Sequence, residues 1–225
     1  IELTSAALIA RPLPNYTKFE ELLNSLSHAL GAVFGIFVLV SCVAASSSAI
    51  AVWGSVVYGA SMILLYAASS VYHGVNPANR LTKQILRIVD HCTIYILIAG
   101  TYTPVVLNAI FPVSPVKAVI VLLGVWGAAA LGISFTAADL QKYSRFSMIC
   151  YIALGWFAIF LIPTIWSAAG AVGTAYLAGG GVCYTIGAAL YGVGKKKRYM
   201  HFVFHIFVLA GTALQYICIL NYIMA

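Results

Sequence analysis

Two histidines near the end of the chain have the residue type and spacing of a metal-binding pair. His201 and His205 are four residues apart, so on a helix they lie on one face, one turn apart. They open an apolar run that continues to Ala225. An imidazole buried among apolar side chains is costly unless its nitrogens are used, and neutral imidazole is a common metal ligand. We therefore expect a metal site that other parts of the chain complete.

The composition predicts an all-α integral membrane protein. Of the 225 residues, 63% are hydrophobic and 8% are charged, whereas soluble domains carry roughly a quarter charged residues. The net charge of +7 comes from basic residues in short segments between apolar runs. It therefore predicts orientation in the membrane, and we expect no nucleic-acid partner. The five cysteines occur singly within apolar runs, which favours neither disulfides nor a thiolate metal site.

Seven apolar runs are long enough to cross a membrane, which predicts a seven-transmembrane-helix bundle. They cover residues 22–45, 49–72, 85–110, 116–136, 146–168, 171–193 and 201–224. Residues 1–19 are expected to form an irregular cytoplasmic tail, broken by Pro12 and Pro14, and residues 20–225 a single transmembrane domain. The chain begins at Ile1 without a methionine, and residues 1–15 show no signal-peptide pattern.

The basic residues predict how the chain is oriented. Of the twelve Lys and Arg residues, all but Lys117 lie in the tail or near the connections that follow the second, fourth and sixth runs. These residues are Arg11, Lys18, Arg80, Lys83, Arg87, Lys142, Arg145, Lys195, Lys196, Lys197 and Arg198. Because Lys and Arg concentrate on the cytoplasmic side, we expect a cytoplasmic amino terminus. After seven crossings, the carboxyl terminus is expected outside.

With this orientation, five polar residues are expected at one depth near the cytoplasmic face. His73 ends the second run, and Ser69 lies one turn earlier on the same face. Asp90 lies near the start of the third run, and His201 and His205 open the seventh. Three imidazoles plus a water or carboxylate complete a tetrahedral zinc shell with an open catalytic position. Asp90 would then hold or deprotonate a water, and the Ser69 hydroxyl would stabilise an oxyanion.

Spacing alone leaves simpler interpretations open. Asp90 is three residues from Arg87, which also fits an ordinary ion pair on a helix surface. His73 alone also fits a solvated helix end, and the last two histidines also fit a pair facing lipid headgroups. The depth that all five residues share favours the metal site over the simpler interpretations taken together.

Two further histidines and one basic run receive other predictions. His91 points about 100° away from Asp90 on a helix, so it is expected to pack or to support the site and not to bind metal. His28 is expected to hydrogen bond to a neighbouring helix. The run Lys195 to Arg198 is an orientation signal that would also attract anionic headgroups.

The full pattern resembles a known family. Ser69-x-x-x-His73, Asp90 seventeen residues later and His201-x-x-x-His205 look like the progestin and adiponectin receptor (PAQR) family, in particular its bacterial hemolysin III branch. The stretches EELLNSLSH (20–28) and VDHCTIYILIAGTYTP (89–104) are similar to signatures of that branch. Together with the seven apolar runs, the resemblance covers almost the whole chain.

The resemblance implies a seven-helix, multi-pass protein of the bacterial cell membrane with a zinc ion near the cytoplasmic face. Carried over residue by residue, the zinc ligands are His73, His201 and His205. Asp90 reaches the metal through a water, and Ser69 matches a serine near the metal. Receptor relatives are linked to ceramidase-like lipid hydrolysis, and bacterial members resemble regulators of membrane lipid state.

We therefore expect a zinc-dependent hydrolase of a lipid amide or ester, involved in membrane lipid homeostasis, with membrane lipids as its partners. The alternative is a non-enzymatic sensor or regulator of the membrane state, in which zinc joins helices structurally. A pore-forming hemolysin is less well supported, because no membrane-embedded charge beyond the histidine cluster lines an obvious conduit. An open coordination position that faces a lipid-accessible cavity favours the enzyme, and a closed four-ligand shell favours the structural role.

Overall fold

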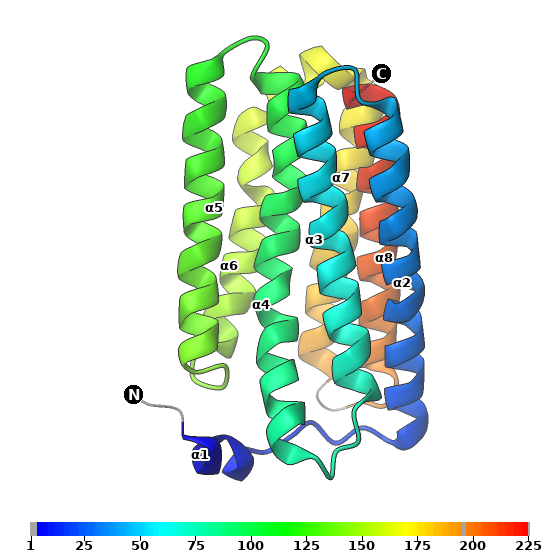
Figure 1. Cartoon of the computed structure of the whole chain (residues 1–225), viewed down its shortest axis with the longest axis vertical. Coiled ribbons are helices and arrows are strands. Elements are labelled where there is room, and N and C mark those ends of the chain that lie inside the picture. The colour runs from blue at the N-terminus through cyan, green and yellow to red at the C-terminus, as the bar shows by residue number, and fades with distance from the viewer. Residues whose placement is uncertain (1–3, 195–196, 225) are drawn as a thin grey trace.

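Long helices run side by side in a bundle, and one short helix lies across the end of the bundle that carries the amino terminus (Figure 1). The computed structural model describes residues 4–194 and 197–224, and these residues contain no strand. The helices are α1 Ser5–Ala10, α2 Lys18–Ala45, α3 Ala49–Gly74, α4 Arg80–Val105, α5 Pro115–Ala138, α6 Ser144–Trp156, α7 Ile162–Gly194 and α8 Met200–Cys218. Single π-helical turns extend α4 and α8 (η1, Val106–Ile110; η3, Ile219–Ile223), and a 3₁₀ turn joins α6 to α7 (η2, Phe157–Leu161).

Six helical segments within the described residues are long and apolar enough to cross a membrane. One of them, Ser144–Gly192, joins α6, η2 and α7 over 49 residues. Its backbone departs from helical geometry at Gly170, where φ is 66°. This is the left-handed region that glycine adopts without steric cost. The break lies between the fifth and sixth apolar runs of the sequence. The expected all-helical, multi-pass membrane architecture is confirmed.

Helix α2 begins with a reciprocal cap. The Thr17 hydroxyl accepts a hydrogen bond from the Glu20 N–H, and the Glu20 carboxylate accepts one from the Thr17 N–H. This arrangement satisfies two backbone donors that would otherwise be unpaired at the helix start. The cap begins the helix at Lys18, four residues before the apolar run that predicted it.

Small residues let α2 and α3 approach closely. A Cβ atom added to Gly31 would lie 2.6 Å from the Tyr66 ring, and one added to Gly35 would lie 3.1 Å from the Ile63 backbone nitrogen. The small-xxx-small spacing of Gly31 and Gly35 thus lets the two helices pack closely.

From Thr4 onward the tail has a defined structure, and the prediction of an irregular segment is wrong for part of it. Residues Ser5–Ala10 form α1, because the Thr4 hydroxyl caps the helix by accepting from the Ala7 N–H. Residues 11–17, which link α1 to α2, form a strap along α4. Arginines and a glutamine of α4 donate to carbonyl oxygens of α1 and of this strap, in the contacts Arg80 to Ile9 and Arg11, Gln84 to Arg11, and Arg87 to Pro12. These backbone contacts depend on geometry across about 70 residues, which local propensity does not report.

Candidate metal centre

Three histidines from two helices converge at the end of the bundle near α1. One nitrogen from each of His73, His201 and His205 lies within 4.8 Å of the other two, and all three side chains are buried. His73 comes from the last turn of α3, while the other two come from the first two turns of α8. The sequence therefore placed the three residues correctly at one depth, and the structure brings their imidazoles into one cluster.

The start of α8 determines where its histidines point. Tyr199 precedes the helix in a left-handed conformation, with φ at 63°. Its backbone N–H donates to the Glu20 carboxylate at 2.9 Å, which ties this turn to the start of α2. Because His201 and His205 are one turn apart, both then face the end of α3.

A partly buried carboxylate orients His73. Glu21 on α2 accepts a hydrogen bond from His73 Nδ1 at 2.6 Å, which leaves Nε2 of the same ring as the nitrogen with a free lone pair. The Lys83 ammonium lies 2.8 Å from the other Glu21 oxygen and donates to the carbonyls of Tyr72 and Val75. This ion pair balances the carboxylate charge and satisfies carbonyls at the end of α3. A carboxylate behind a histidine is a common support for metal ligands.

His205 is oriented in a similar way by a hydroxyl. The Ser27 hydroxyl donates its proton to the Asn24 carbonyl oxygen. Ser27 Oγ is therefore the acceptor in its contact with His205 Nδ1, at 3.1 Å. The proton of His205 is thereby assigned to Nδ1 by its partner, and Nε2 carries the lone pair. In two of the three rings, Nδ1 is thus engaged by a partner and Nε2 is the nitrogen directed to the cluster.

The geometry of the cluster fits a zinc ion. Nε2 of His73 and Nε2 of His201 are 3.1 Å apart, close to the ~3.3 Å that tetrahedral zinc with bonds of 2.0–2.1 Å imposes on two nitrogens. His201 Nδ1 is buried without a hydrogen-bond partner among the described residues. Three imidazoles with small mutual distances, two of them held by partners on Nδ1, form a donor set typical of zinc sites.

Asp90 and Ser69 lie beside the cluster and not within it. Both side chains are buried and line the same cavity as His201 and His205. The structure shows no ion pair between Asp90 and Arg87: the Arg87 guanidinium donates to the Pro12 carbonyl oxygen at 3.2 Å, and Asp90 Oδ2 lies 3.9 Å from His91 Nδ1. Asp90 therefore lines the cavity beside His201 and His205 without a guanidinium partner.

The other two histidines differ in how well their roles were predicted. His91 bonds through Nδ1 to the Arg87 carbonyl oxygen and lies outside the cluster, as expected. For His28, the prediction of a hydrogen bond to a neighbouring helix is wrong, since both of its nitrogens are buried without a partner among the described residues. Its ring instead stacks on His205, with centroids 3.5 Å apart and planes 12° apart. Stacking satisfies the ring faces but leaves the nitrogens unpaired.

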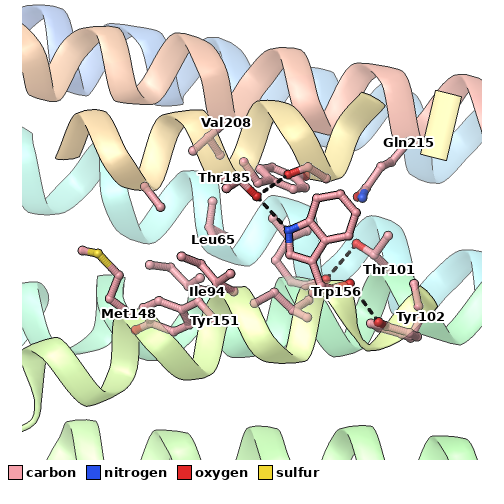
Figure 2. A pocket seen from close by; sticks show the side chains of 18 of the residues that line it. Leu65, Ile94, Thr101, Tyr102, Met148, Tyr151, Trp156, Thr185, Val208 and Gln215 are labelled. Carbon is pink, nitrogen blue, oxygen red and sulfur yellow. Dashed lines mark hydrogen bonds between the residues drawn. The ribbon is translucent and has the colours of Figure 1, made fainter. Parts of the chain in front are cut away.

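A cavity begins at the cluster and continues into the bundle between α4, α6, α7 and α8. Asp90, His201 and His205 line one end, and Figure 2 shows the apolar middle, with Leu65, Ile94 and Val208 among its walls. The middle of the cavity offers few polar atoms, so it is suited to an apolar chain.

The sequence comparisons agree with this architecture and site. The chain matches the family described as "Haemolysin-III related" over residues 16–216. It belongs to this family. The haemolysin-III related relatives include "Hemolysin-3 homolog" of Bacillus subtilis, 33% identical over 92% of this chain and 96% of the relative. Another is "Hemolysin-3" of Bacillus cereus, 33% identical over 91% of this chain and 92% of the relative.

A more distant relative is the human "Monocyte to macrophage differentiation factor", 27% identical over 74% of this chain and 69% of that protein. The resemblance to the progestin and adiponectin receptor family and its hemolysin III branch is thus confirmed.

In this haemolysin-III related protein, an aromatic side chain from the tail covers the cluster. The Tyr16 ring lies 5.1 Å from that of His201 and 5.9 Å from that of His73, centroid to centroid. Burial, together with the nearby Tyr191 and Glu21, raises the pKa of the Tyr16 phenol well above its ordinary value, so it stays neutral. The strap therefore closes the end of the site with an uncharged ring.

Sequence reasoning missed Tyr16, Glu21 and Lys83 as parts of the site. Glu21 belongs to the first-helix stretch similar to the family signature, and a carboxylate in an apolar span is a signal that it supports something buried. Lys83 was read only as an orientation signal. Tyr16 carries no comparable signal, because only the fold of the strap brings it to the cluster.

Proposed function

We propose that this protein is a zinc-dependent membrane hydrolase that cleaves an amide or ester bond of a lipid and thereby contributes to membrane lipid homeostasis. His73, His201 and His205 would hold the ion. The observation that carries the proposal is the cavity that starts at His201 and His205 of this cluster and is also lined by Asp90 and Ser69. A purely structural zinc site needs no acid, hydroxyl and apolar cavity beside it.

The proposed topology has seven crossings, with the site at the cytoplasmic face of the bacterial cell membrane. As one straight helix, the 49 residues of Ser144–Gly192 would be about 74 Å long, more than twice the ~30 Å hydrocarbon layer. The break at Gly170 divides this segment into two pieces of crossing length. The basic residues Arg80, Lys83 and Arg87 share the end of the bundle with α1, which by the positive-inside rule is the cytoplasmic end. Lys195 and Lys196 of the basic run lie outside the described residues.

The roles of the protein's own groups follow from their positions. When bound, zinc would supply Lewis acidity, which lowers the pKa of water to about 7 and polarises a carbonyl. Asp90 is placed to orient a water and accept its proton, since the carboxylate is not occupied by Arg87. The Ser69 hydroxyl faces the same cavity and would donate to the oxygen of the scissile carbonyl as negative charge develops there.

The apolar part of the cavity would bind a hydrocarbon chain of the lipid, and Tyr16 would limit access of bulk water from the cytoplasmic end. The rival is a zinc-stabilised sensor without turnover, in which the same cavity binds a lipid effector. The two differ in what Asp90 does: in the hydrolase it handles a proton, whereas in the sensor it only fills space and helps to hold the ion.

The test is Asp90→Asn, measured on purified protein incubated with membrane lipids, with zinc content, melting temperature and lipid products recorded for the same preparation. We expect zinc and stability to be retained and product formation to fall by about 10²- to 10⁴-fold, because the amide does not take up a proton. Asp139→Asn, at the same end of the bundle but outside the cavity, is the matched control and should keep its activity. If wild-type protein forms no product, or if Asp90→Asn keeps full activity with zinc bound, the hydrolase proposal fails and the sensor remains.

A further inference from the structure

The far end of the cavity, away from the histidines, is polar. Figure 2 shows Thr101, Tyr102, Trp156, Thr185 and Gln215 gathered there, from α4, α6, α7 and α8. A polar group in the middle of an apolar bundle is costly unless it is paired, so each of these side chains needs a partner.

Four of these five side chains have such a partner within the protein. Trp156 Nε1 donates to Thr185 Oγ1 at 2.9 Å, and the Thr185 hydroxyl donates to the Gly181 carbonyl oxygen at 2.8 Å. Thr101 donates to the carbonyl oxygen of Leu97, and Tyr102 to that of Leu154. Their hydrogen-bonding capacity is thus used inside the bundle.

Gln215 is the exception among the five. Its side-chain amide has two donor hydrogens and one acceptor oxygen, and no hydrogen bond from it is formed within the part of the chain that the structure describes. The side chain extends from α8 into the cavity, with its amide at the tip (Figure 2). An unpaired amide within the membrane favours a ligand that can both accept and donate.

The neighbouring helix leaves room for this side chain. A Cβ atom added to Gly180 on α7 would lie 2.5 Å from Cγ of Gln215 and 3.2 Å from its Cδ. A Cβ added to Gly181 would lie 3.7 Å from the Trp156 ring. The absence of a side chain at Gly180 therefore allows Gln215 to reach the cavity. Gly181 likewise leaves room for the Trp156 indole, which forms the opposite wall of the cavity.

The position of Gln215 along α8 sets the length of a ligand that reaches from one polar end to the other. It follows His201 by fourteen residues on one helix, so the two are separated by about 21 Å along the axis at 1.5 Å per residue. An extended hydrocarbon chain of about 16 to 18 carbons has this length, because a zigzag of ~1.5 Å bonds advances by about 1.3 Å per bond. Among the described lining residues, this end of the cavity has no Lys or Arg to pair an ionised group. The group that meets Gln215 is therefore neutral.

We propose that Gln215 forms a second binding subsite, in which its amide binds a hydroxyl at the far end of an unbranched chain of about 16 to 18 carbons whose head lies at the histidine cluster. The inference rests on the proposed function in one respect, that the cavity takes a lipid chain headed at the metal centre. It adds the substrate class: long-chain lipids hydroxylated at or near the chain end are preferred over plain chains of equal length.

The experiment measures binding and not turnover. The affinities of hexadecanoic acid and 16-hydroxyhexadecanoic acid are compared for wild-type protein, Gln215→Leu and the more nearly isosteric Gln215→Met. We expect the preference for the hydroxylated probe over the plain one to fall by about 10-fold in both variants, since each loses a hydrogen-bonding pair. Met148 also lines the cavity (Figure 2), and Met148→Leu replaces one apolar side chain by another. This variant is the matched control and should keep the wild-type preference. Melting temperature and zinc content verify that each variant is folded.

The outcomes separate this inference from the proposed function. An equal preference in wild type and both Gln215 variants overturns the subsite, and so does a wild-type protein that binds neither probe. A preference that depends on Gln215 in a protein that hydrolyses no lipid supports the subsite and refutes the hydrolase. Hydrolysis that depends on Asp90, together with a preference that does not depend on Gln215, supports the hydrolase and refutes the subsite.

Discussion

The two sides of the bundle are packed in different ways, and the glycines show the contrast. On α2, α3 and α4, Cβ atoms added to Gly31, Gly59 or Gly100 would collide with the neighbouring helix. On α5 and α6, Cβ atoms added to Gly124 or Gly155 would have no atom within 4 Å, although one added to Gly132 of α5 would collide with the Tyr95 ring of α4. The tightly packed side supplies Glu21, His73 and Asp90, whereas α6, together with α7 and α8, lines the cavity opposite α4.

The difference in packing matches the two proposed tasks, metal binding and binding of a lipid chain. Metal ligands need positions fixed to within about half an ångström, which closely packed helices provide. A chain-binding cavity needs walls that adjust to the ligand, and helices with few close contacts allow this. α8 belongs to both sides, because its first two turns carry the histidines and its later turns carry Gln215.

The largest effect on stability is expected where a side chain is added at a close contact between two helices. In Gly59→Ala, the added Cβ would lie 2.5 Å from Cβ and 2.7 Å from Cα of Leu39, so α2 and α3 must separate. We expect the free energy of unfolding to fall by about 1–3 kcal/mol. The matched variant Gly124→Ala should be neutral or stabilising by up to about 1 kcal/mol, since alanine favours the helix and meets no neighbour.

Thermal unfolding of both alanine variants in the same detergent checks this prediction. Equal melting temperatures for Gly59→Ala and Gly124→Ala would mean that the two sides do not differ in packing.

The second-largest effect is expected at Glu21, on the closely packed side of the bundle. In Glu21→Gln, the carboxylate that accepts from His73 Nδ1 and pairs with Lys83 is replaced by a neutral amide. We expect zinc affinity to fall by about 10- to 100-fold, as for the loss of other groups that orient a ligand histidine. Competition with a zinc chelator measures the change, and Glu2→Gln in the tail provides a charge-matched control. Unchanged affinity in Glu21→Gln would show that the carboxylate does not support the site.

The smallest effect is expected where the tail meets the open side. Arg11 forms an ion pair with Asp139 at 2.8 Å, at the end of α5. The Lys142 backbone N–H and the Arg11 guanidinium lower the pKa of Asp139 below its ordinary value. A carboxylate with a lowered pKa contributes stability that is complete above its ordinary pKa and is lost as the pH falls through the lowered one.

Limited proteolysis of the tail as a function of pH tests this contact. Cleavage should become faster only in acid, below the ordinary pKa of aspartate. The acid-dependent part should be absent in Asp139→Asn, which lacks the titrating group; an identical pH profile in that variant would exclude the carboxylate as the cause.

The sequence was sufficient to predict those features that depend on a local, repeating pattern of residues. Apolar runs of crossing length predicted the helices, and the i,i+4 spacing of His201 and His205 predicted a shared face. Counting crossings brought His73 to the same end without any knowledge of how the helices pack. These inferences need only the helical repeat and the thickness of a membrane.

The remaining features depend on contacts that no local pattern encodes. The pairing of Glu21 with His73 spans 52 residues, and that of Ser27 with His205 spans 178. His28 was expected to hydrogen bond, but the packing of α2 against α8 places its ring flat on His205. The fold of the strap brings Tyr16 over the cluster, although its own sequence is typical of a loop.

The central claim is that His73, His201 and His205 bind zinc as one site, and zinc content measured directly on purified protein tests it. Wild-type protein should contain about one zinc per chain, and His201→Ala should lose most of it, because two remaining imidazoles hold the ion far less well. His91→Ala, which removes a histidine at the same end but outside the cluster, should keep its zinc. Wild-type protein without zinc, or equal zinc content in the two variants, would contradict the account.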